Sequence, residues 1–206
     1  MQDEKARRSG HETQPSMRGK VCVVTGANNG FGFVTSRRLA ALGASVLMVC
    51  RSRERGAARG RIEEATGRRP ELFLGDFLLQ ADVRRVAGEI RARYAKVDVL
   101  LNNAGYAYAE RELTPEGFER TFALNYLAYF TLTLEMLPLL RRAGAARIVN
   151  TASSSHRWRD VSLDNLQGER SFPVKRWPPL SGMYGWTNAQ RIMFTYELAD
   201  RLRGGG

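Results

Sequence analysis

Cysteine, long apolar runs and acidic side chains are all scarce in this sequence, and each shortage narrows the class of protein. The 206 residues contain only two cysteines, Cys22 and Cys50, whose spacing fits no metal site. Both fall in expected buried strands, so the sequence predicts a reduced, cytoplasmic protein without a bound metal. No apolar run approaches the roughly 20 residues that a membrane helix needs, so we expect no integral membrane segment.

An apolar segment is also lacking at the start of the chain. Residues 1–16 are polar and charged, which argues against a secretory signal and favours a disordered leader. Residues 17–206 are then expected to form one domain, because a chain of this length can bury a core without disulfides. No internal repeat is evident.

Acidic residues are outnumbered, with 21 Asp and Glu against 32 Lys and Arg, for a net charge of +11. Such a balance can indicate a nucleic-acid partner or an anionic surface. The excess is mostly arginine, however, and it is spread along the chain without the interleaved aromatic side chains of single-strand binders. A solvated arginine-rich surface is therefore favoured, and no nucleic-acid partner is expected.

Short apolar runs alternate with longer helical patterns after the leader. Strands are expected at residues 20–25, 45–50, 71–74, 97–101 and 147–151. Helices are expected at residues 30–42, 54–65, 81–94, 114–142 and 184–202. Thr114 and Pro115 are read as the N-cap and first position of the longest helix. This alternation predicts an α/β fold, a Rossmann-like doubly wound parallel sheet flanked by helices.

Glycines are concentrated between the first expected strand and the first expected helix, in the segment Thr25-Gly26-Ala27-Asn28-Asn29-Gly30-Phe31-Gly32. Gly26 permits a tight turn, Gly30 lets the backbone approach a pyrophosphate, and Gly32 permits close packing of helix and strand. The helix N-terminus adds free N–H groups and a partial positive charge. A structural glycine turn is the alternative, but the strand and helix on either side favour cofactor binding.

The segment TGANNGFG resembles the TGxxxGxG motif of the short-chain dehydrogenase/reductase family, and Leu101-Asn102-Asn103-Ala104-Gly105 resembles its NNAG motif. The resemblance covers roughly residues 17–203. Within the family, four segments are most similar to the retinol-dehydrogenase-like branch: residues 50–52, 147–150, 164–167 and 194–199. The implied cofactor-binding residues are Gly26, Asn28, Asn29, Gly30, Phe31, Gly32, Arg51, Asp76, Asn102, Ala104 and Gly105.

An acid is lacking after the second strand, where NAD-binding proteins often carry one. Arg51 follows Cys50 there, and its guanidinium suits a 2′-phosphate, with Arg53 and Arg55 close behind. NADP(H) is therefore favoured over NAD(H), although these arginines could simply face solvent. Asp76 resembles the adenine-contacting Asp of the family, with a turn or helix cap as the alternative.

The resemblance also implies a catalytic set that transfers hydride between NADP(H) and a lipophilic aldehyde, ketone or alcohol. Tyr184 matches the general acid/base, Ser153 the serine that steadies the substrate oxygen, and Asn125 the proton-relay asparagine. Ser154 and Ser155 leave the choice of serine open. Asn125 could instead be a core asparagine bonded to the backbone.

The family's catalytic lysine is absent. Asn188 occupies its position, four residues after Tyr184 on the same helical face, where it could bond ribose but brings no charge. Arg191 could substitute for that charge, but an ordinary surface arginine is the favoured interpretation. The loop from His156 to Met183 is expected to contact substrate through Trp158 and Trp177.

The chain ends after the helix that bears Tyr184, whereas family members continue with further elements. A C-terminally truncated sheet of about five strands in the order 3-2-1-4-5, with an exposed edge, is therefore expected. The resemblance implies a homodimer through the helices that carry Asn125 and Tyr184. The alternative function is a catalytically silent NADP(H)-binding or interaction protein, a truncated pseudoenzyme.

Overall fold

The computed structural model describes residues 16–203, apart from 53–57, 159–160 and 173–181. Five parallel strands form one sheet in the order β3-β2-β1-β4-β5, which confirms the predicted fold class and strand order. The strands are β1 (Val21–Thr25), β2 (Ser45–Cys50), β3 (Glu71–Leu74), β4 (Val99–Asn102) and β5 (Arg147–Asn150).

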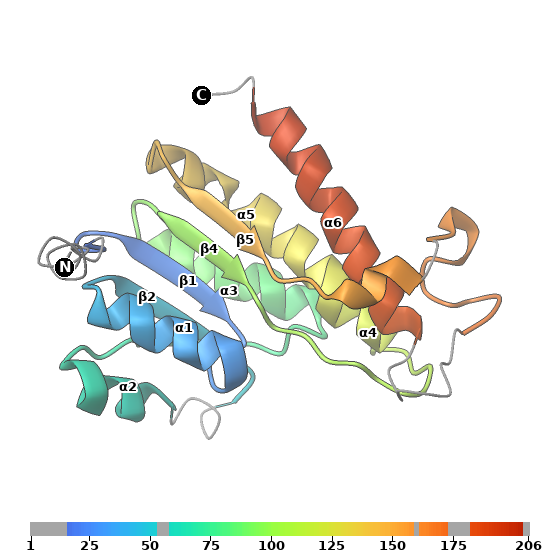
Figure 1. Ribbon diagram of the computed structural model, residues 1–206, viewed down its shortest axis with the longest axis horizontal. Helices are drawn as coiled ribbons and strands as arrows, with labels where there is room; N and C mark the ends of the chain where they lie inside the picture. Colours follow the sequence, from blue (N-terminus) through green and yellow to red (C-terminus); the bar gives the residue numbers. More distant parts are fainter. Residues whose placement is uncertain (1–15, 53–57, 159–160, 173–181, 204–206) are drawn as a thin grey trace, which may run out of the picture.

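Helices cover both faces of the sheet, α1 and α2 on one and α3 and α5 on the other (Figure 1). The α-helices are α1 (Gly30–Ala41), α2 (Ala58–Thr66), α3 (Gln80–Arg93), α4 (Arg120–Phe122), α5 (Ala128–Arg142) and α6 (Gly182–Leu202). A π-helical turn, η3 (Ala123–Leu127), joins α4 to α5. Two 3-10 turns, η4 (Ser154–Trp158) and η5 (Leu163–Asn165), precede α6.

The two faces of the sheet carry separate apolar clusters. Val23 and Leu47 pack with residues of α3 and α5, while Val24 and Met48 pack with residues of α1 and α2. Successive side chains of a strand point to opposite faces, so a strand covered on both faces must be apolar throughout. This explains why the central strands read as unbroken apolar runs.

The longest helix begins at Arg120, so its predicted start at Thr114 and Pro115 is wrong. Thr114 instead opens a turn, because the Gly117 N–H donates to its carbonyl oxygen at 2.9 Å and Gly117 has φ +83°. Glu119 is the N-cap, and its carboxylate accepts from the N–H groups of Thr121 and Phe122, the second and third residues of the helix. A Thr-Pro pair suits the start of a turn as well as that of a helix.

The continuous helix Arg120–Arg142 is 23 residues long and, by length and composition alone, apolar enough to cross a membrane. It is the one such helix in the part of the chain that the structure describes. Polar residues interrupt its apolar ones, so the sequence contains no unbroken apolar run of that length, and the expected absence of a membrane segment stays a prediction. Of its most apolar window, 56% is buried inside the molecule, as in the core helix of a globular domain.

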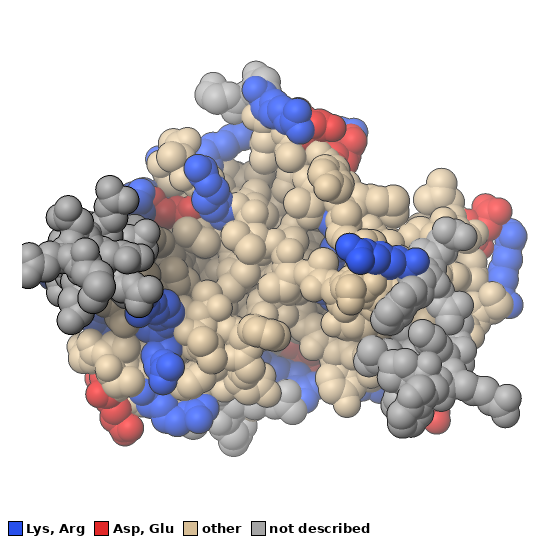
Figure 2. All heavy atoms as spheres, viewed as in Figure 1, with Lys and Arg blue, Asp and Glu red and all other residues tan. Residues whose placement is uncertain are grey.

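Basic side chains occupy several separate places on the face shown in Figure 2, among many uncharged residues. Nearly all of the predicted leader lies outside the described residues, as do Arg53, Arg55 and Trp177.

Candidate active site

The loop between β1 and α1 turns sharply because two of its glycines adopt positive φ, +64° at Gly26 and +50° at Gly30. An ideal Cβ on Gly26 would lie 2.9 Å from the Ala104 Cα, and one on Gly32 would lie 2.3 Å from the Gly26 carbonyl oxygen. Neither position has room for a side chain, so the loop, α1 and the end of β4 pack backbone to backbone. Nothing lies within 4 Å of a Cβ on Gly30, which leaves that backbone open.

The first turn of α1 is suited to an anion. The N-cap Asn29 makes no side-chain cap hydrogen bond, and the first turn contains no acidic residue. The first N–H groups of a helix have no helical carbonyl to bond, and they carry the positive end of the helix dipole. The Phe31 side chain points away from the core, with 85% of its surface exposed. This donor set fits the diphosphate of a dinucleotide.

The last residue of β1 ties the glycine loop to the turn after β4. Thr25 Oγ1 accepts from the N–H groups of Asn103 at 2.9 Å and Ala104 at 3.0 Å. The Asn103 amide in turn donates to the Thr25 carbonyl oxygen at 3.1 Å. The sequence did not lead us to expect Thr25 and Asn103 as site residues, although both lie within the TGxxxGxG and NNAG motifs.

Asn102 lies behind this turn, fully buried. Its Nδ2 donates to Thr133 Oγ1 at 3.0 Å and to Asn150 Oδ1 at 2.8 Å, so it joins β4 to α5 and β5. Its side chain therefore holds the sheet together beneath the site.

A pocket of about 650 Å³ opens along the carboxyl ends of β1, β2, β3 and β4. The chain crosses from one side of β1 to the other here, and open α/β sheets bind ligands at such a switch point. Seven of the predicted cofactor-binding residues line the pocket: Gly26, Asn28, Asn29, Arg51, Asp76, Ala104 and Gly105. The other four, Gly30, Phe31, Gly32 and Asn102, do not line it.

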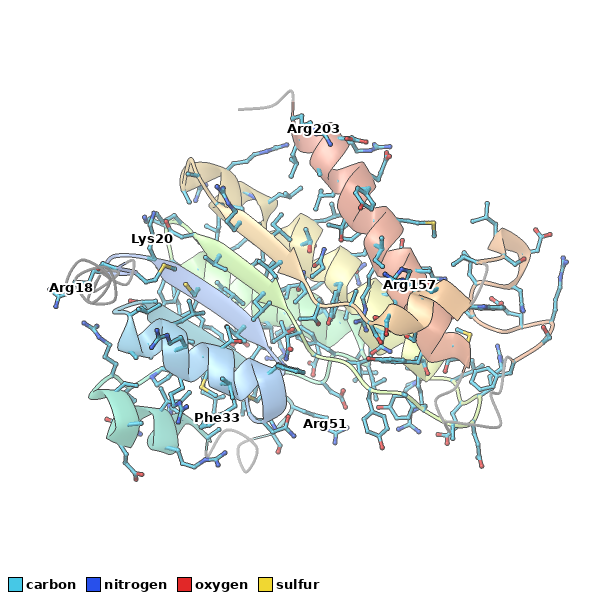
Figure 3. All side chains as sticks on the ribbon, viewed as in Figure 1. Arg18, Lys20, Phe33, Arg51, Arg157 and Arg203 are labelled. Carbon is cyan, nitrogen blue, oxygen red and sulfur yellow. The ribbon has the colours of Figure 1, made fainter. Side chains whose placement is uncertain are left out.

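The side of the pocket at the end of β2 is positively charged and has no acid from that strand. The exposed Arg51 lies at the same end of the sheet as the first turn of α1 (Figure 3). Burial raises the pKa of the neighbouring Cys50 thiol to about 11, so that side chain is neutral near pH 7. Arg120 adds a second guanidinium, and among the described residues that line the pocket Asp76 is the one acidic residue.

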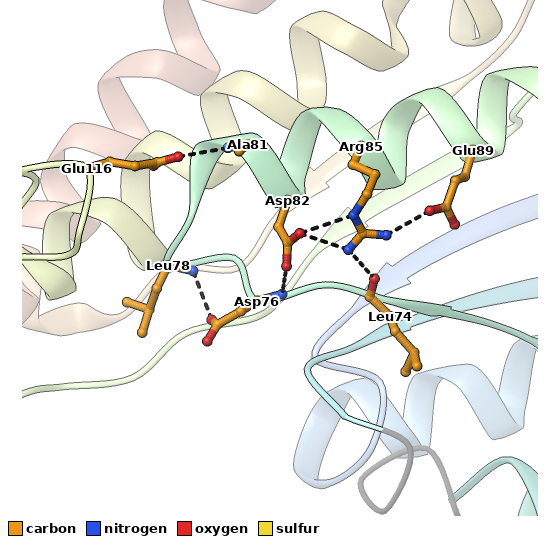
Figure 4. Close-up of polar contacts among 8 residues, drawn as sticks. All are labelled: Leu74, Asp76, Leu78, Ala81, Asp82, Arg85, Glu89 and Glu116. Atoms are coloured by element: carbon orange, nitrogen blue, oxygen red, sulfur yellow. Dashed lines mark hydrogen bonds and ion pairs between the residues drawn. The ribbon is translucent and has the colours of Figure 1, made fainter.

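Asp76 takes part in a turn while it lines the pocket (Figure 4). Its Oδ1 accepts from the Leu78 N–H at 3.1 Å, and its own N–H donates to Asp82 Oδ2 at 2.8 Å. Arg85 holds the Asp82 carboxylate at 2.8 Å. Asp76 therefore does take part in a turn, which is the alternative to the adenine contact.

The Glu116 carboxylate caps the start of α3, because it accepts from the N–H groups of Gln80 and Ala81. Glu116 lies more than 30 residues away from them in the sequence, so sequence spacing could not predict this cap.

Asn125 lies fully buried in the π-helical turn η3. Its Oδ1 accepts from the Tyr106 N–H at 3.0 Å and its Nδ2 donates to the Tyr106 carbonyl oxygen at 2.8 Å. A weaker contact joins Nδ2 to Thr187 Oγ1 on α6 at 3.4 Å. Asn125 thus fixes the segment after the NNAG turn to α6, and π-helical turns are frequent at functional sites.

The N-terminal half of α6 carries Tyr184 and Asn188, neither of which lines the pocket. Tyr184 is half-buried, and Asn188 is fully buried. Asn188 Nδ2 donates to the Tyr184 carbonyl oxygen at 2.6 Å and to Ser155 Oγ at 3.4 Å. Asn188 therefore bonds within its own helix and to η4.

The three serines after β5 differ in their surroundings. Ser153 is half-buried, and its hydroxyl oxygen accepts from the Ser155 N–H at 3.3 Å. Ser154 is exposed, whereas Ser155 is buried against Asn188. His156 Nδ1 lies 2.8 Å from the Ser153 carbonyl oxygen, which anchors this segment.

Arg191 is buried with 3% of its surface exposed, so its interpretation as an ordinary surface arginine is wrong. Its Nε donates to the Asn125 carbonyl oxygen, and its NH1 donates to the Thr151 carbonyl oxygen at 2.9 Å. Its guanidinium carbon lies 4.4 Å from the centre of the Tyr129 ring. Helical spacing alone could not show this burial, because η3 and the end of β5 supply the covering groups.

This sheet order and a glycine loop at the switch point define a dinucleotide-binding Rossmann fold. The sequence profile of the short chain dehydrogenase family matches residues 20–159, and the chain belongs to that family.

The relatives confirm the likeness to the retinol-dehydrogenase-like branch. Retinol dehydrogenase 14 of Mus musculus is 34% identical over 200 residues, which cover 91% of this chain and 58% of the relative. Retinol dehydrogenase 11 of Homo sapiens is 36% identical over 191 residues, with the same coverage. The chain thus spans about 58% of the length of these relatives.

Solved structures share the fold. A short chain dehydrogenase of Shigella flexneri complexed with NADP has a TM-score of 0.72 at 26% identity, over 91% of this chain and 74% of that one. One from Escherichia coli complexed with NADPH has a TM-score of 0.73 at 27% identity, over 91% and 73%.

Proposed function

We propose that the protein is an NADP(H)-dependent oxidoreductase that acts on a lipophilic aldehyde, ketone or alcohol. The observation that carries this proposal is the pocket at the switch point, which at one side is lined by Arg51 and by Asn28 and Asn29, the two residues directly before α1. Its other side, at Gly105 and Tyr106, adjoins Asn125. Retinol dehydrogenases among the relatives support a lipophilic substrate.

Each part of the pocket suits one part of the cofactor. The N–H groups at the start of α1 would hold the diphosphate, and Arg51 would bind the 2′-phosphate through two parallel hydrogen bonds. Asp76 would contact the adenine. NADPH would supply the hydride for carbonyl reduction.

The chain's own groups would manage the proton. Tyr184 would give its hydroxyl proton to the substrate oxygen in reduction and take a proton back in oxidation. Ser153 would donate a hydrogen bond to that oxygen. Asn125 keeps the Tyr106 backbone and α6 in register, so the substrate oxygen would meet these groups in a fixed geometry.

A catalytically silent NADP(H)-binding protein is the second candidate, favoured by the neutral Asn188 at the position of the family's lysine. NADPH oxidation with a series of aliphatic and aromatic aldehydes and ketones distinguishes the two. Turnover above the rate without protein supports the enzyme, and NADPH binding without turnover of any substrate in the series supports the silent protein.

The cofactor preference is tested by Arg51→Ala. We expect NADPH affinity to fall about tenfold or more and NADH affinity to stay within about twofold, because only NADPH carries the 2′-phosphate. The control is Arg38→Ala, which removes an exposed arginine of α1 outside the pocket and should change neither affinity. Equal weakening of both cofactors by Arg51→Ala would contradict the assignment.

A further inference from the structure

The charge of Arg191 is buried and has no acidic partner in the part of the chain that the structure describes. Its hydrogen-bond acceptors are two backbone carbonyl oxygens and, at 3.4 Å, Asn188 Oδ1. It forms no ion pair with any Asp or Glu of the described ranges. Removal of a charge from water is costly, and proteins usually balance it with an opposite charge. A buried cation left in this state calls for a functional explanation.

One nitrogen of the guanidinium faces the pocket wall. Arg191 NH2 is buried and has no hydrogen-bond partner among the residues that the structure describes. An ideal Cβ on Gly105 would lie 3.3 Å from this nitrogen and 3.1 Å from Asn125 Oδ1. Gly105 lines the pocket, so only a thin backbone wall separates the cation from it.

The guanidinium also belongs to the face of α6 that carries Tyr184. Tyr184, Asn188 and Arg191 are spaced i, i+4 and i+7 and so share one side of the helix. Asn188 bridges the other two, since it donates to the Tyr184 carbonyl oxygen and accepts from Arg191 NH1. The cation therefore lies two helical turns from the proposed acid/base, and its own side chain is almost fully buried.

Among the described residues, the groups that face Arg191 from the surrounding elements include no carboxylate. Tyr129 on α5 and Tyr184 on α6 are the titratable groups that interact with it electrostatically. η3 and the segment after β5 offer the carbonyl oxygens of Asn125 and Thr151, and His156 of η4 is engaged with Ser153. Burial lowers the pKa of Arg191, yet arginine stays protonated in proteins.

We propose that Arg191 is the positioning cation of this site and supplies the positive charge that a lysine at position 188 would otherwise bring. The inference rests on the proposed function. In carbonyl reduction the O–H bond of Tyr184 breaks, a substrate O–H bond forms, and negative charge is left on the tyrosine oxygen. The buried guanidinium stabilises that charge through the low-dielectric interior, and water later returns the proton. Arg191 also locks Asn125 and Asn188 in place.

The first test needs no turnover. Tyrosine ionisation is followed by ultraviolet absorbance from pH 7 to 12, and the contribution of Tyr184 is obtained by subtraction of the Tyr184→Phe variant. We expect Arg191→Met to move the midpoint of that contribution upward by about one pH unit or more, because a nearby cation favours the phenolate. Arg201→Met removes an exposed arginine from the same helix and should leave it in place. An unchanged midpoint in Arg191→Met would overturn the proposal.

The second test moves the positive charge from position 191 to position 188. Arg191→Asn should lower kcat about 100-fold with little change in the KM for NADPH, and Asn188→Lys in that background should recover most of the loss. The pH profile of kcat should shift upward in the single variant and return in the double variant. Failure of recovery in a folded double variant, judged by circular dichroism, would refute the electrostatic role.

Arg191→Lys keeps the positive charge and so tests the proposal even if the uncharged variants fail to fold. A retained pH profile with modestly reduced kcat supports a requirement for charge, whereas a profile shifted like that of a neutral variant contradicts it. Different results would refute the proposed function and the role of Arg191. Absence of NADPH binding by the unmodified chain refutes the oxidoreductase, while turnover that survives Arg191→Met unchanged refutes only the role of Arg191.

Discussion

Asp98 and Arg191 show how differently single buried charges are accommodated in this molecule. Asp98 has a side chain only 3% exposed, but it accepts from Lys20 Nζ at 2.9 Å, Lys96 Nζ at 3.2 Å and the Val21 N–H at 3.0 Å. Burial raises the pKa of Asp98, yet the hydrogen bonds from Val21, Lys20 and Lys96 outweigh burial and the net pKa is lowered. Arg191 has carbonyl oxygens in place of such counter-charges.

Asp98→Asn should lower the free energy of unfolding by about 1–3 kcal/mol at pH 7, because it removes the buried carboxylate that accepts from Lys20, Lys96 and the Val21 N–H. The lowered pKa sets the sign of the pH dependence. The stabilisation by Asp98 is complete above the unfolded carboxyl pKa of about 3.9 and is lost as the pH falls through the folded value.

Urea unfolding of both proteins at several pH values from 7 to 3 measures this difference. The difference in the free energy of unfolding between the two proteins should be constant near neutrality and should disappear below pH 4. A difference that grows as the pH falls would contradict the assignment.

At the scale of elements, the loop between β1 and α1 is held by contacts that leave no room for a Cβ. Gly32→Ala should lower stability by about 1–3 kcal/mol, because the new methyl group overlaps the Gly26 carbonyl oxygen and must displace α1. The same displacement should weaken NADPH binding at least about tenfold.

Gly88→Ala is the matched control, since nothing lies within 4 Å of a Cβ at that position in α3. It should raise stability by about 0.5–1 kcal/mol and leave NADPH binding intact. Chemical denaturation and fluorescence titration of both variants are the measurements. Normal NADPH affinity in Gly32→Ala would argue against a role for this loop.

Elements whose signals are local could be predicted from the sequence. The strand bounds at 45–50 and 71–74 agree with the structure residue for residue, because apolar runs bounded by polar turns define buried strands. The start of the longest helix could not be predicted, since Glu119 becomes a buried cap only when Gln167 packs beside it. The burial of Arg191 could not be predicted for the same reason, because its partners come from two distant segments, the helix Arg120–Arg142 and the residue after β5.

At the scale of the whole molecule, apolar side chains remain exposed on α5, α6 and the edge strand β5. They are Phe130, Leu134, Val149, Met193 and Tyr196. We predict that the chain forms a homodimer in which α5 and α6 bury part of this surface. Leu134→Glu should then shift the mass measured by light scattering from dimer to monomer.

Leu163→Glu, at an exposed leucine in η5, is the control and should leave the dimer intact. A monomer at every concentration of the unmodified chain would contradict the predicted dimer, and the active site would then have to be complete within one chain.

The central claim is that the glycine loop and the first turn of α1 hold the diphosphate of a nicotinamide dinucleotide. Isothermal titration calorimetry of the folded chain with NADPH and with NADH tests it most directly. We predict one NADPH bound per chain, with higher affinity than NADH because of Arg51. No heat of binding from either cofactor would contradict the account.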